Sequence, residues 1–166
     1  PLKLESRPGA GSQLQLECLI ASDADFPAPV KRAVRQDLSG LKVLIIDDHE
    51  DVLDALSSQL VSLDCDVWVA NSPDELEKQL QQPACRPDIV LTDDLLQDGV
   101  RANDVMDRVL AHSDIQARFI VITGNTDSER LRKLNSLGVP VLHKPIETDQ
   151  LIQCLSEQME ALGESH

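Results

Sequence analysis

The sequence predicts an α/β fold in which a parallel β-sheet carries helices on both faces. Five short apolar runs, rich in β-branched residues, lie at 41–46, 65–70, 88–92, 118–123 and 139–142. Five stretches with helical spacing lie between and after them, near 50–63, 73–82, 101–113, 127–137 and 147–162. Strands that alternate with helices of this length are typical of βα units in a parallel sheet. The runs are nearly all apolar, as expected for strands that are covered on both faces.

Signals at the helix ends support these boundaries. Ser72 is placed as an N-cap, Pro73 takes the first helical position, and Glu75 can complete a capping box. Thr126 begins a second capping-box pattern, and Gly138 can close the helix that follows it in a left-handed conformation. Leucines at helical spacing line the first and the last helix, which indicates core packing and no functional role.

The first forty residues have a different character. Leucines alternate with polar residues on either side of Ser-Arg-Pro-Gly-Ala-Gly-Ser, which predicts a β-hairpin over 1–20. Residues 21–40 are rich in Ala, Asp and Pro and predict a linker, so the α/β domain is expected over 41–162. A lone hairpin is marginal in water, so it must dock on the domain, pair with another chain, or belong to a larger sheet. The first residue is Pro, which favours a fragment of a longer protein.

Composition limits the classes of partner. The net charge of −14 argues against binding to nucleic acid and against adsorption to anionic membranes. The cysteines Cys18, Cys65, Cys85 and Cys154 have no metal-ligand spacing, so reduced thiols are expected rather than a disulfide framework. No apolar run is long enough to span a bilayer and no signal peptide is evident, so a cytoplasmic location is expected.

Polar residues stand where four of the apolar runs end. Asp47 and Asp48 follow the first run, Asp93 follows the third, Thr123 ends the fourth, and Lys144 comes just after the fifth. Ligands of open parallel sheets bind beyond the carboxyl ends of the strands, so these residues are expected to converge at one edge. Carboxylates prefer Mg²⁺ as their cation, and an ammonium and a hydroxyl can bind phosphoryl oxygens. The set therefore predicts a site for Mg²⁺ and a phosphoryl group, with Asp93 as nucleophile.

Each of these polar residues, taken alone, also has a simpler structural interpretation. Asp47 or Asp48 could be only the N-cap of the first helix. Asp93 could be one of several solvated acids, because Asp94 and Asp98 are close by. His49, beside the acidic pair, is expected to be a solvated residue at the start of that helix rather than a ligand. The joint placement of four such residue types at four strand ends favours the functional interpretation.

Residues 41–160 resemble a receiver (response-regulator) domain of two-component phosphorelays. LKVLIIDDHEDV resembles the first strand and acidic pair of that family, and PDIVLTD resembles its phospho-acceptor strand. FIVITGN resembles the strand that ends in the switch threonine, and VLHKPI the lysine–proline loop. The resemblance implies a flavodoxin-like (βα)₅ doubly wound parallel sheet with strand order 2-1-3-4-5.

The same resemblance implies a role for each site residue. Asp93 would accept a phosphoryl group from a phosphohistidine of a kinase or a phosphotransfer protein, and Thr123 and Lys144 would contact that group. Four groups would hold Mg²⁺: Asp47, Asp48, Asp93 and the backbone carbonyl of Leu95. Dimerisation is expected, if it occurs, through the N-terminal hairpin or through the face made by the last two helices and the last strand.

The N-terminal segment resembles part of another domain. PLKLESRPGAGSQLQLECLIA resembles the last hairpin of a histidine-kinase ATP-binding domain. A kinase tail, a linker and a receiver follow that order in hybrid sensor histidine kinases, so the whole protein is expected to be such a kinase in a bacterial cytoplasm or membrane. The chain itself holds neither a phosphorylatable-histidine segment nor the nucleotide-binding boxes, so it is not expected to be a kinase. With no output domain after the receiver, relay or feedback is favoured over transcription.

Departures from the family pattern keep alternatives open. Gln97 stands where many receivers have proline, and Val141 stands where many have an aromatic switch residue. Leu95 is apolar where a polar residue could position water, which predicts slow hydrolysis of the phosphoryl group. One alternative is a receiver-like interaction module that is not phosphorylated. Another is a phosphohydrolase with an aspartyl nucleophile, although Asp47-Asp48-His49 lacks the Asp-x-Asp that such enzymes carry.

Overall fold

The chain divides into two compact units, Pro1–Val34 and Arg35–His166. The computed structural model describes residues 2–7, 11–16, 37–125, 128–136 and 138–163. The smaller unit contains a two-stranded antiparallel sheet, made by β1 (Leu2–Arg7) and β2 (Gly11–Leu16), with Leu4 opposite Leu14. This agrees with the hairpin expected from the alternating leucines. Cys18 and most of the expected linker lie outside the described residues.

The larger unit is built on a five-stranded sheet in which all neighbouring strands are parallel. Its strands are β3 (Lys42–Ile46), β4 (Asp66–Ala70), β5 (Ile89–Asp93), β6 (Arg118–Thr123) and β7 (Val141–His143). Their order in the sheet is β4-β3-β5-β6-β7. Counted within this unit, that is the order 2-1-3-4-5, and the predicted flavodoxin-like, doubly wound fold is confirmed.

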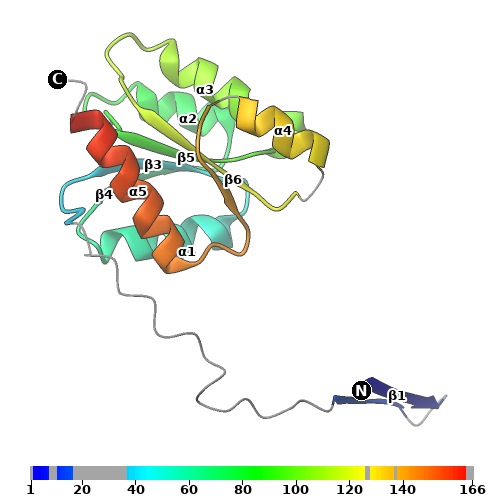
Figure 1. Cartoon of the computed structure of the whole chain (residues 1–166). Coiled ribbons are helices and arrows are strands. Elements are labelled where there is room, and N and C mark those ends of the chain that lie inside the picture. Colours follow the sequence, from blue (N-terminus) through cyan, green and yellow to red (C-terminus); the bar gives the residue numbers. More distant parts are fainter. Residues whose placement is uncertain (1, 8–10, 17–36, 126–127, 137, 164–166) are drawn as a thin grey trace. The chain divides into compact units, whose positions relative to one another are not determined.

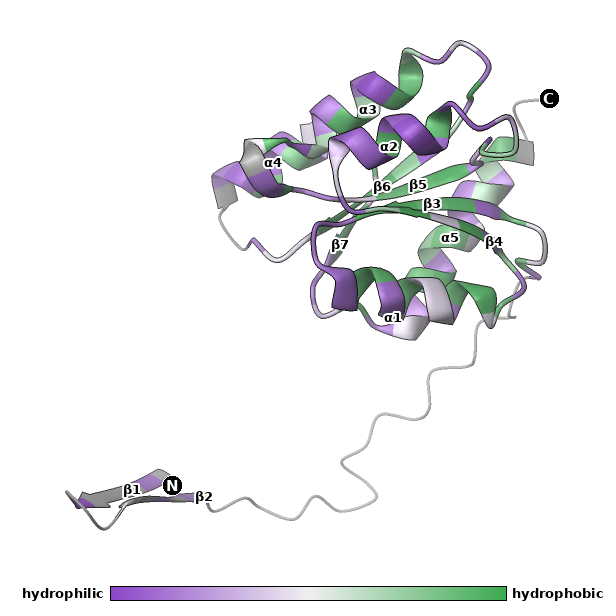
Figure 2. Cartoon of the chain, turned by 180° about the vertical axis from the view of Figure 1, so that it is seen from behind, coloured by the Kyte–Doolittle hydropathy of each residue, from purple (hydrophilic) through white to green (hydrophobic). Residues whose placement is uncertain are grey.

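Helices cover both faces of this sheet, as Figures 1 and 2 show. On one face lie α1 (Glu50–Val61) and α5 (Thr148–Gly163). On the other lie α2 (Pro73–Leu80), α3 (Ala102–Leu110) and α4 (Ser128–Ser136), with a short 3₁₀ turn at Gln97–Gly99 before α3. Within the described parts of the chain, no helix is both long and apolar enough to cross a membrane.

The two-residue period of a strand divides the core between these faces. Val43 and Ile45 of β3 pack with the α1 and α5 side, whereas Leu44 and Ile46 pack with the α2 and α3 side, and all four are fully buried. The middle of the sheet is therefore apolar on both faces, and Figure 2 shows the strands largely in the hydrophobic colour. Leu38, within the range expected as linker, is 3% exposed and joins this core, so packing begins before residue 41.

The helix-end signals can be compared with the structure. The Ser72 hydroxyl accepts a hydrogen bond from the Glu75 amide at 3.3 Å, and Glu75 accepts one from the Asn71 amide, with Pro73 at the first helical position. Gly138 has a φ of 71°, as predicted for the residue that closes α4. Thr126, expected to cap α4, lies outside the described residues.

Candidate functional site

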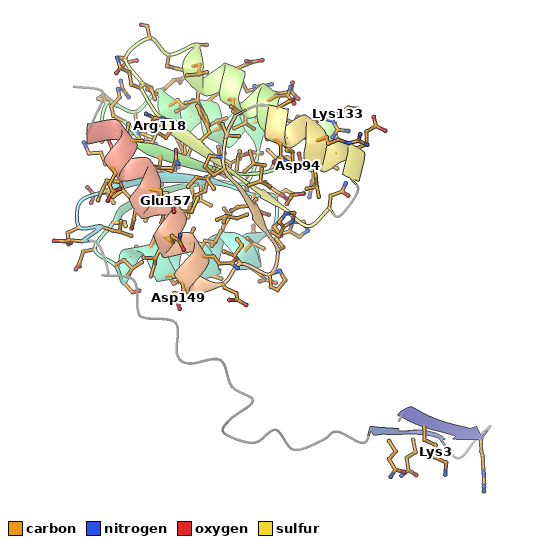
Figure 3. The ribbon with its side chains drawn as sticks, in the orientation of Figure 1. Lys3, Asp94, Arg118, Lys133, Asp149 and Glu157 are labelled. Atoms are coloured by element: carbon orange, nitrogen blue, oxygen red, sulfur yellow. The ribbon has the colours of Figure 1, made fainter. Side chains whose placement is uncertain are left out.

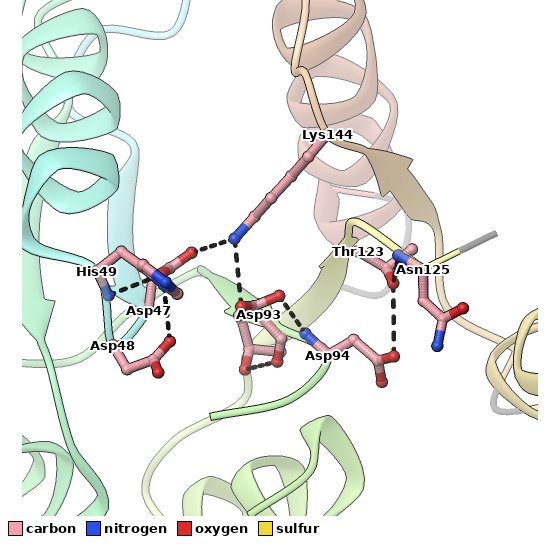
Figure 4. Close-up of polar contacts among 9 residues, drawn as sticks. Asp47, Asp48, His49, Asp93, Asp94, Thr123, Asn125 and Lys144 are labelled. Carbon is pink, nitrogen blue, oxygen red and sulfur yellow. Dashed lines mark hydrogen bonds and ion pairs between the residues drawn. The ribbon is translucent and has the colours of Figure 1, made fainter. Parts of the chain in front are cut away.

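The strand ends bring the polar residues of the sequence pattern to one edge of the sheet. Asp93 and Thr123 are the last residues of β5 and β6, which are neighbours in the sheet. Asp47 directly follows β3, and Lys144 directly follows β7. Figure 4 shows their side chains gathered above the ends of these strands. The convergence expected from a parallel sheet is present.

Lys144 lies between two carboxylates (Figure 4). Its ammonium donates to Asp47 Oδ2 at 2.8 Å and to Asp93 Oδ2 at 3.2 Å. Burial works against the charged form of Lys144, but the hydrogen bond to Asp47 and the charge of Asp93 outweigh it, so the pKa of the lysine is raised. The ammonium therefore stays charged and offsets the repulsion between the two acids.

Asp93 is held by both of its oxygens. Oδ2 accepts from Lys144, and Oδ1 accepts from the Asp94 amide at 2.8 Å. Only 8% of the residue is exposed, and this burial raises the pKa of its carboxyl, opposed by Lys144 and reinforced by the charge of Asp47. The Asp93 carboxylate is therefore oriented by two hydrogen bonds, and the positive charge of Lys144 does not fully compensate its negative charge.

Four side chains form an acidic cluster that could hold a cation. Ligand atoms of Asp47, Asp48, His49 and Asp93 all lie within 4.8 Å of one another. Asp48 Oδ1 is buried and accepts no directional hydrogen bond within the described structure, although His49 Nδ1 lies 3.0 Å from it. An unsatisfied carboxylate oxygen beside two other acids suits a hard cation such as Mg²⁺.

His49 is more closely tied to this cluster than the sequence indicated. Its side chain is exposed, as expected, but Nδ1 lies 3.1 Å from Asp47 Oδ1. The hydrogen bond to Asp47, followed by the charge of Asp48, raises the pKa of the imidazole. His49 is also the N-cap residue of α1, so neither Asp47 nor Asp48 takes that place. Asp47 instead accepts from the His49 amide at 2.9 Å.

A hollow of about 430 Å³ opens beside Asp93. Its lining residues are Asp93, Asp94, Leu95, Arg101, Thr123, Gly124, Asn125 and Lys144. Leu95 is half exposed, and an isolated antiparallel bridge joins its backbone to that of Arg101. The role expected for the Leu95 carbonyl stays a prediction.

Asp94 is the site residue that sequence reasoning missed. The sequence pointed to it only as an acid close to Asp93, but it is just 4% exposed. Its Oδ2 accepts from Arg130 Nε at 2.9 Å, and its Oδ1 is paired with Arg130 Nη2. Thr123 Oγ1 lies 3.4 Å from Asp94 Oδ2. Figure 3 places Asp94 close to α4, the helix that carries Arg130.

Solved structures of receiver domains share this fold. A receiver domain protein from Clostridium thermocellum superposes with a TM-score of 0.65 at 20% identity, covering 75% of this chain and 98% of its own. The receiver domain of a modulated diguanylate cyclase from Desulfovibrio desulfuricans gives 0.61 at 26% identity, with 75% and 97% covered. A receiver protein from Pseudomonas putida gives 0.61 at 26% identity, with 72% and 98% covered. None of the curated proteins compared with the chain matches it.

The sequence profile of the response regulator receiver domain matches residues 43–156. That range begins in β3, ends in α5, and contains Asp47, Asp93, Thr123 and Lys144. The match, the strand order and the residues at the strand ends agree, and this chain belongs to the response regulator receiver domains of two-component signalling.

Proposed function

We propose that this chain is the phospho-acceptor domain of a phosphorelay, in which Asp93 takes a phosphoryl group from a phosphohistidine in a Mg²⁺-dependent reaction. The observation that carries the proposal is the position of Asp93 between Lys144 and the acidic cluster. Phosphoryl transfer depends mainly on positioning and charge neutralisation, and this arrangement offers both.

In the proposed step, a carboxylate oxygen of Asp93 attacks the phosphorus of the phosphohistidine. The new P–O bond forms as the P–N bond breaks, and the imidazole nitrogen keeps the bonding pair, so the ring leaves neutral when its other nitrogen carries a proton. Lys144 donates to one phosphoryl oxygen, because its ammonium already lies within hydrogen-bonding distance of Asp93. Thr123 donates to a second, since this residue lines the same hollow.

The acidic residues fit Mg²⁺. We assign it to Asp47, Asp48, Asp93 and the backbone carbonyl of Leu95. The buried Oδ1 of Asp48, which has no hydrogen-bond partner within the described structure beyond the nearby His49 ring, supports this assignment. When bound, the ion neutralises charge that builds up between Asp93 and the phosphoryl oxygens.

We place this receiver in a hybrid sensor histidine kinase of the bacterial cytoplasm. The support is the N-terminal hairpin, whose Ser-Arg-Pro-Gly-Ala-Gly-Ser segment resembles the final hairpin of a kinase ATP-binding domain and whose two flanking strands pair antiparallel. Its partners would be the phosphohistidine of that kinase or of a phosphotransfer protein. The net charge of −14 favours protein partners over nucleic acid.

The experiment that tests phosphorylation is intact-mass measurement after incubation with Mg²⁺ and acetyl phosphate. The wild type should gain one phosphoryl mass, and Asp93→Asn should gain none. Asp107→Asn is the matched control, since it removes an exposed acid on α3 and should still be phosphorylated. A gain that persists in Asp93→Asn would move the acceptor elsewhere. No gain in the wild type would favour an interaction module that is not phosphorylated.

The donor needs a separate test. A histidine phosphotransfer protein can be phosphorylated with phosphoramidate, purified, and mixed with this chain and Mg²⁺. Loss of phosphate from the histidine, with its appearance on Asp93, is the expected result. The phosphorelay assignment would be contradicted if acetyl phosphate phosphorylated the chain but neither this phosphotransfer protein nor a phosphorylated kinase core did. Asp93 would then still be the acceptor.

A further inference from the structure

The residue after the phospho-acceptor is built into a buried ion pair. Asp94 and Arg130 form a two-bond contact, and the Arg130 side chain is itself only 14% exposed. The hydrogen bond from Arg130 to Asp94 raises the pKa of the guanidinium, so Arg130 stays charged. Arg130 lies in the first turn of α4, and Asp94 directly follows β5. The pair therefore joins the phospho-acceptor strand to that helix.

The Thr123 hydroxyl connects this pair to the site. Its oxygen accepts from the Asn125 amide at 3.0 Å, and its proton is directed at Asp94 Oδ2, 3.4 Å away. A hydroxyl has one proton to donate. It can serve Asp94 or a phosphoryl group on Asp93, but it cannot serve both fully at once.

We infer that Asp94 is a positioning residue that holds the Thr123 hydroxyl away from Asp93 in the resting state. We also infer that Arg130 transmits a change in this hydrogen bond to α4. The inference rests on the proposed function of Asp93. When a phosphoryl group draws the Thr123 proton away, Asp94 loses one of its donors and faces a new anion on the adjacent residue. The carboxylate then keeps its two-bond contact with Arg130, and it shifts together with the start of α4.

The Asp94–Arg130 pair offers a route from the site to α4 in a chain that has no aromatic residue at the switch position. Val141 occupies that slot in β7, where it packs against the small cluster of Ala102, Val121 and Leu134. The Val141 side chain has no polar group, so it cannot form a hydrogen bond with the Thr123 hydroxyl when that hydroxyl moves. The Asp94–Arg130 pair, in contrast, touches Thr123 at one end and belongs to α4 at the other.

A double-mutant cycle with beryllofluoride and Mg²⁺ tests the positioning role. Asp94→Ala should tighten beryllofluoride binding, partly because a negative charge is removed and partly because Thr123 is released. Only the second part needs the hydroxyl, so the gain should be about threefold to tenfold smaller in the Thr123→Val background, the range expected for one hydrogen bond. Equal gains in both backgrounds would overturn the inference, because Asp94 would then act through its charge alone.

A second cycle tests the resting state without any ligand. The loss of thermal midpoint caused by Asp94→Ala should be about 2–4 °C smaller when Thr123 is already Val. Additive losses would contradict the inference whether or not the protein is phosphorylated. If the wild type fails to bind beryllofluoride but this coupling is present, the proposed function fails while the Asp94–Thr123 contact stands. Asp94→Leu, which also lacks an acceptor for the Thr123 hydroxyl, serves in both cycles if Asp94→Ala does not fold.

Amide hydrogen exchange tests the link to α4. Beryllofluoride should change exchange in the peptide that covers residues 128–136 of the wild type. Arg130→Gln should abolish at least half of that change, whereas the exposed Arg132→Gln, a matched substitution on the same helix, should keep it. An undiminished response in Arg130→Gln would show that the signal reaches α4 by another route.

Discussion

The Lys144 ammonium lies 3.2 Å from the Asp93 carboxylate, although 51 residues separate them in the chain. The end of β5 carries Asp93, and the loop after β7 carries Lys144. Asp47, which follows β3, lies 2.8 Å from the same ammonium. The lysine therefore stabilises the structure before any phosphoryl group arrives, because its positive charge offsets the repulsion between two nearly buried carboxylates.

This arrangement predicts that Lys144→Met destabilises the metal-free protein. Removing one partner of a buried ion pair costs about 3–5 kcal/mol, and the partial exposure of Lys144 places the loss at the lower end. Urea denaturation in EDTA measures it. Mg²⁺ should restore much of the loss, since the cation replaces the missing charge.

Lys133→Met is the control for this prediction. Lys133 pairs with Glu129 on the surface of α4, where both side chains are about two-thirds exposed. Such pairs contribute about 0–1 kcal/mol, so the substitution should change stability little and should not respond to Mg²⁺. Equal losses in the two variants would show that the Lys144 contacts have no special weight.

A second prediction concerns the cost of the charge on Asp93. Burial raises the pKa of its carboxyl, so this group stabilises the fold fully below its unfolded pKa of about 3.9 and loses that contribution as the pH rises through the folded value. At pH 7.5 in EDTA, Asp93→Asn should therefore unfold at higher urea than the wild type. The difference should vanish near pH 3.5.

Asp94→Asn should behave in the opposite way. It keeps the shape of the side chain but removes the charge that Arg130 binds, so stability should fall. The two neighbouring substitutions thus give opposite signs in one assay. Stabilisation by both would mean that general repulsion in an acidic chain, and not local contacts, sets the stability of these variants.

Much of this site follows from order along the chain. Asp47, Asp93 and Thr123 stand where apolar strands stop, and a parallel sheet places all such ends at one edge. The strand order and the roles of the residues came from family resemblance, because alternation of strands and helices alone does not fix which strands are neighbours.

The contacts that sequence reasoning missed depend on tertiary placement. Asp94 meets Arg130 across 36 residues, and only the packing of α4 over the sheet brings them together. No spacing rule in the sequence distinguishes a buried, paired aspartate at position 94 from a solvated one. His49 likewise takes its contacts from the turn after β3, where the backbone of the loop turns the imidazole toward Asp47 and Asp48.

A third prediction concerns the thiols. Burial, followed by the charge of Glu157, raises the pKa of Cys154 to about 11, so roughly one thousandth of it is thiolate at pH 8. Burial also raises the pKa of Cys65 and Cys85. These three residues should resist iodoacetamide in the native protein and react in urea, which peptide mass mapping can follow. Native labelling of Cys154 at the rate seen in urea would contradict its burial.

The last prediction rests on Leu95 and on the proposed phosphorylation of Asp93. Leu95 lines the hollow beside Asp93 and is 50% exposed, so an apolar side chain stands where water must approach the phosphoryl group. Asn in its place could bind that water and orient it, and Leu95→Asn should therefore speed the decay of phospho-Asp93 several-fold. Loss of the phosphoryl mass over time measures the rate. Leu110→Asn, a similarly exposed leucine on α3, is the matched control and should leave the rate unchanged. If the two variants decay alike, Leu95 does not shield the phosphoryl group, and the lifetime is set by the residues that bind it.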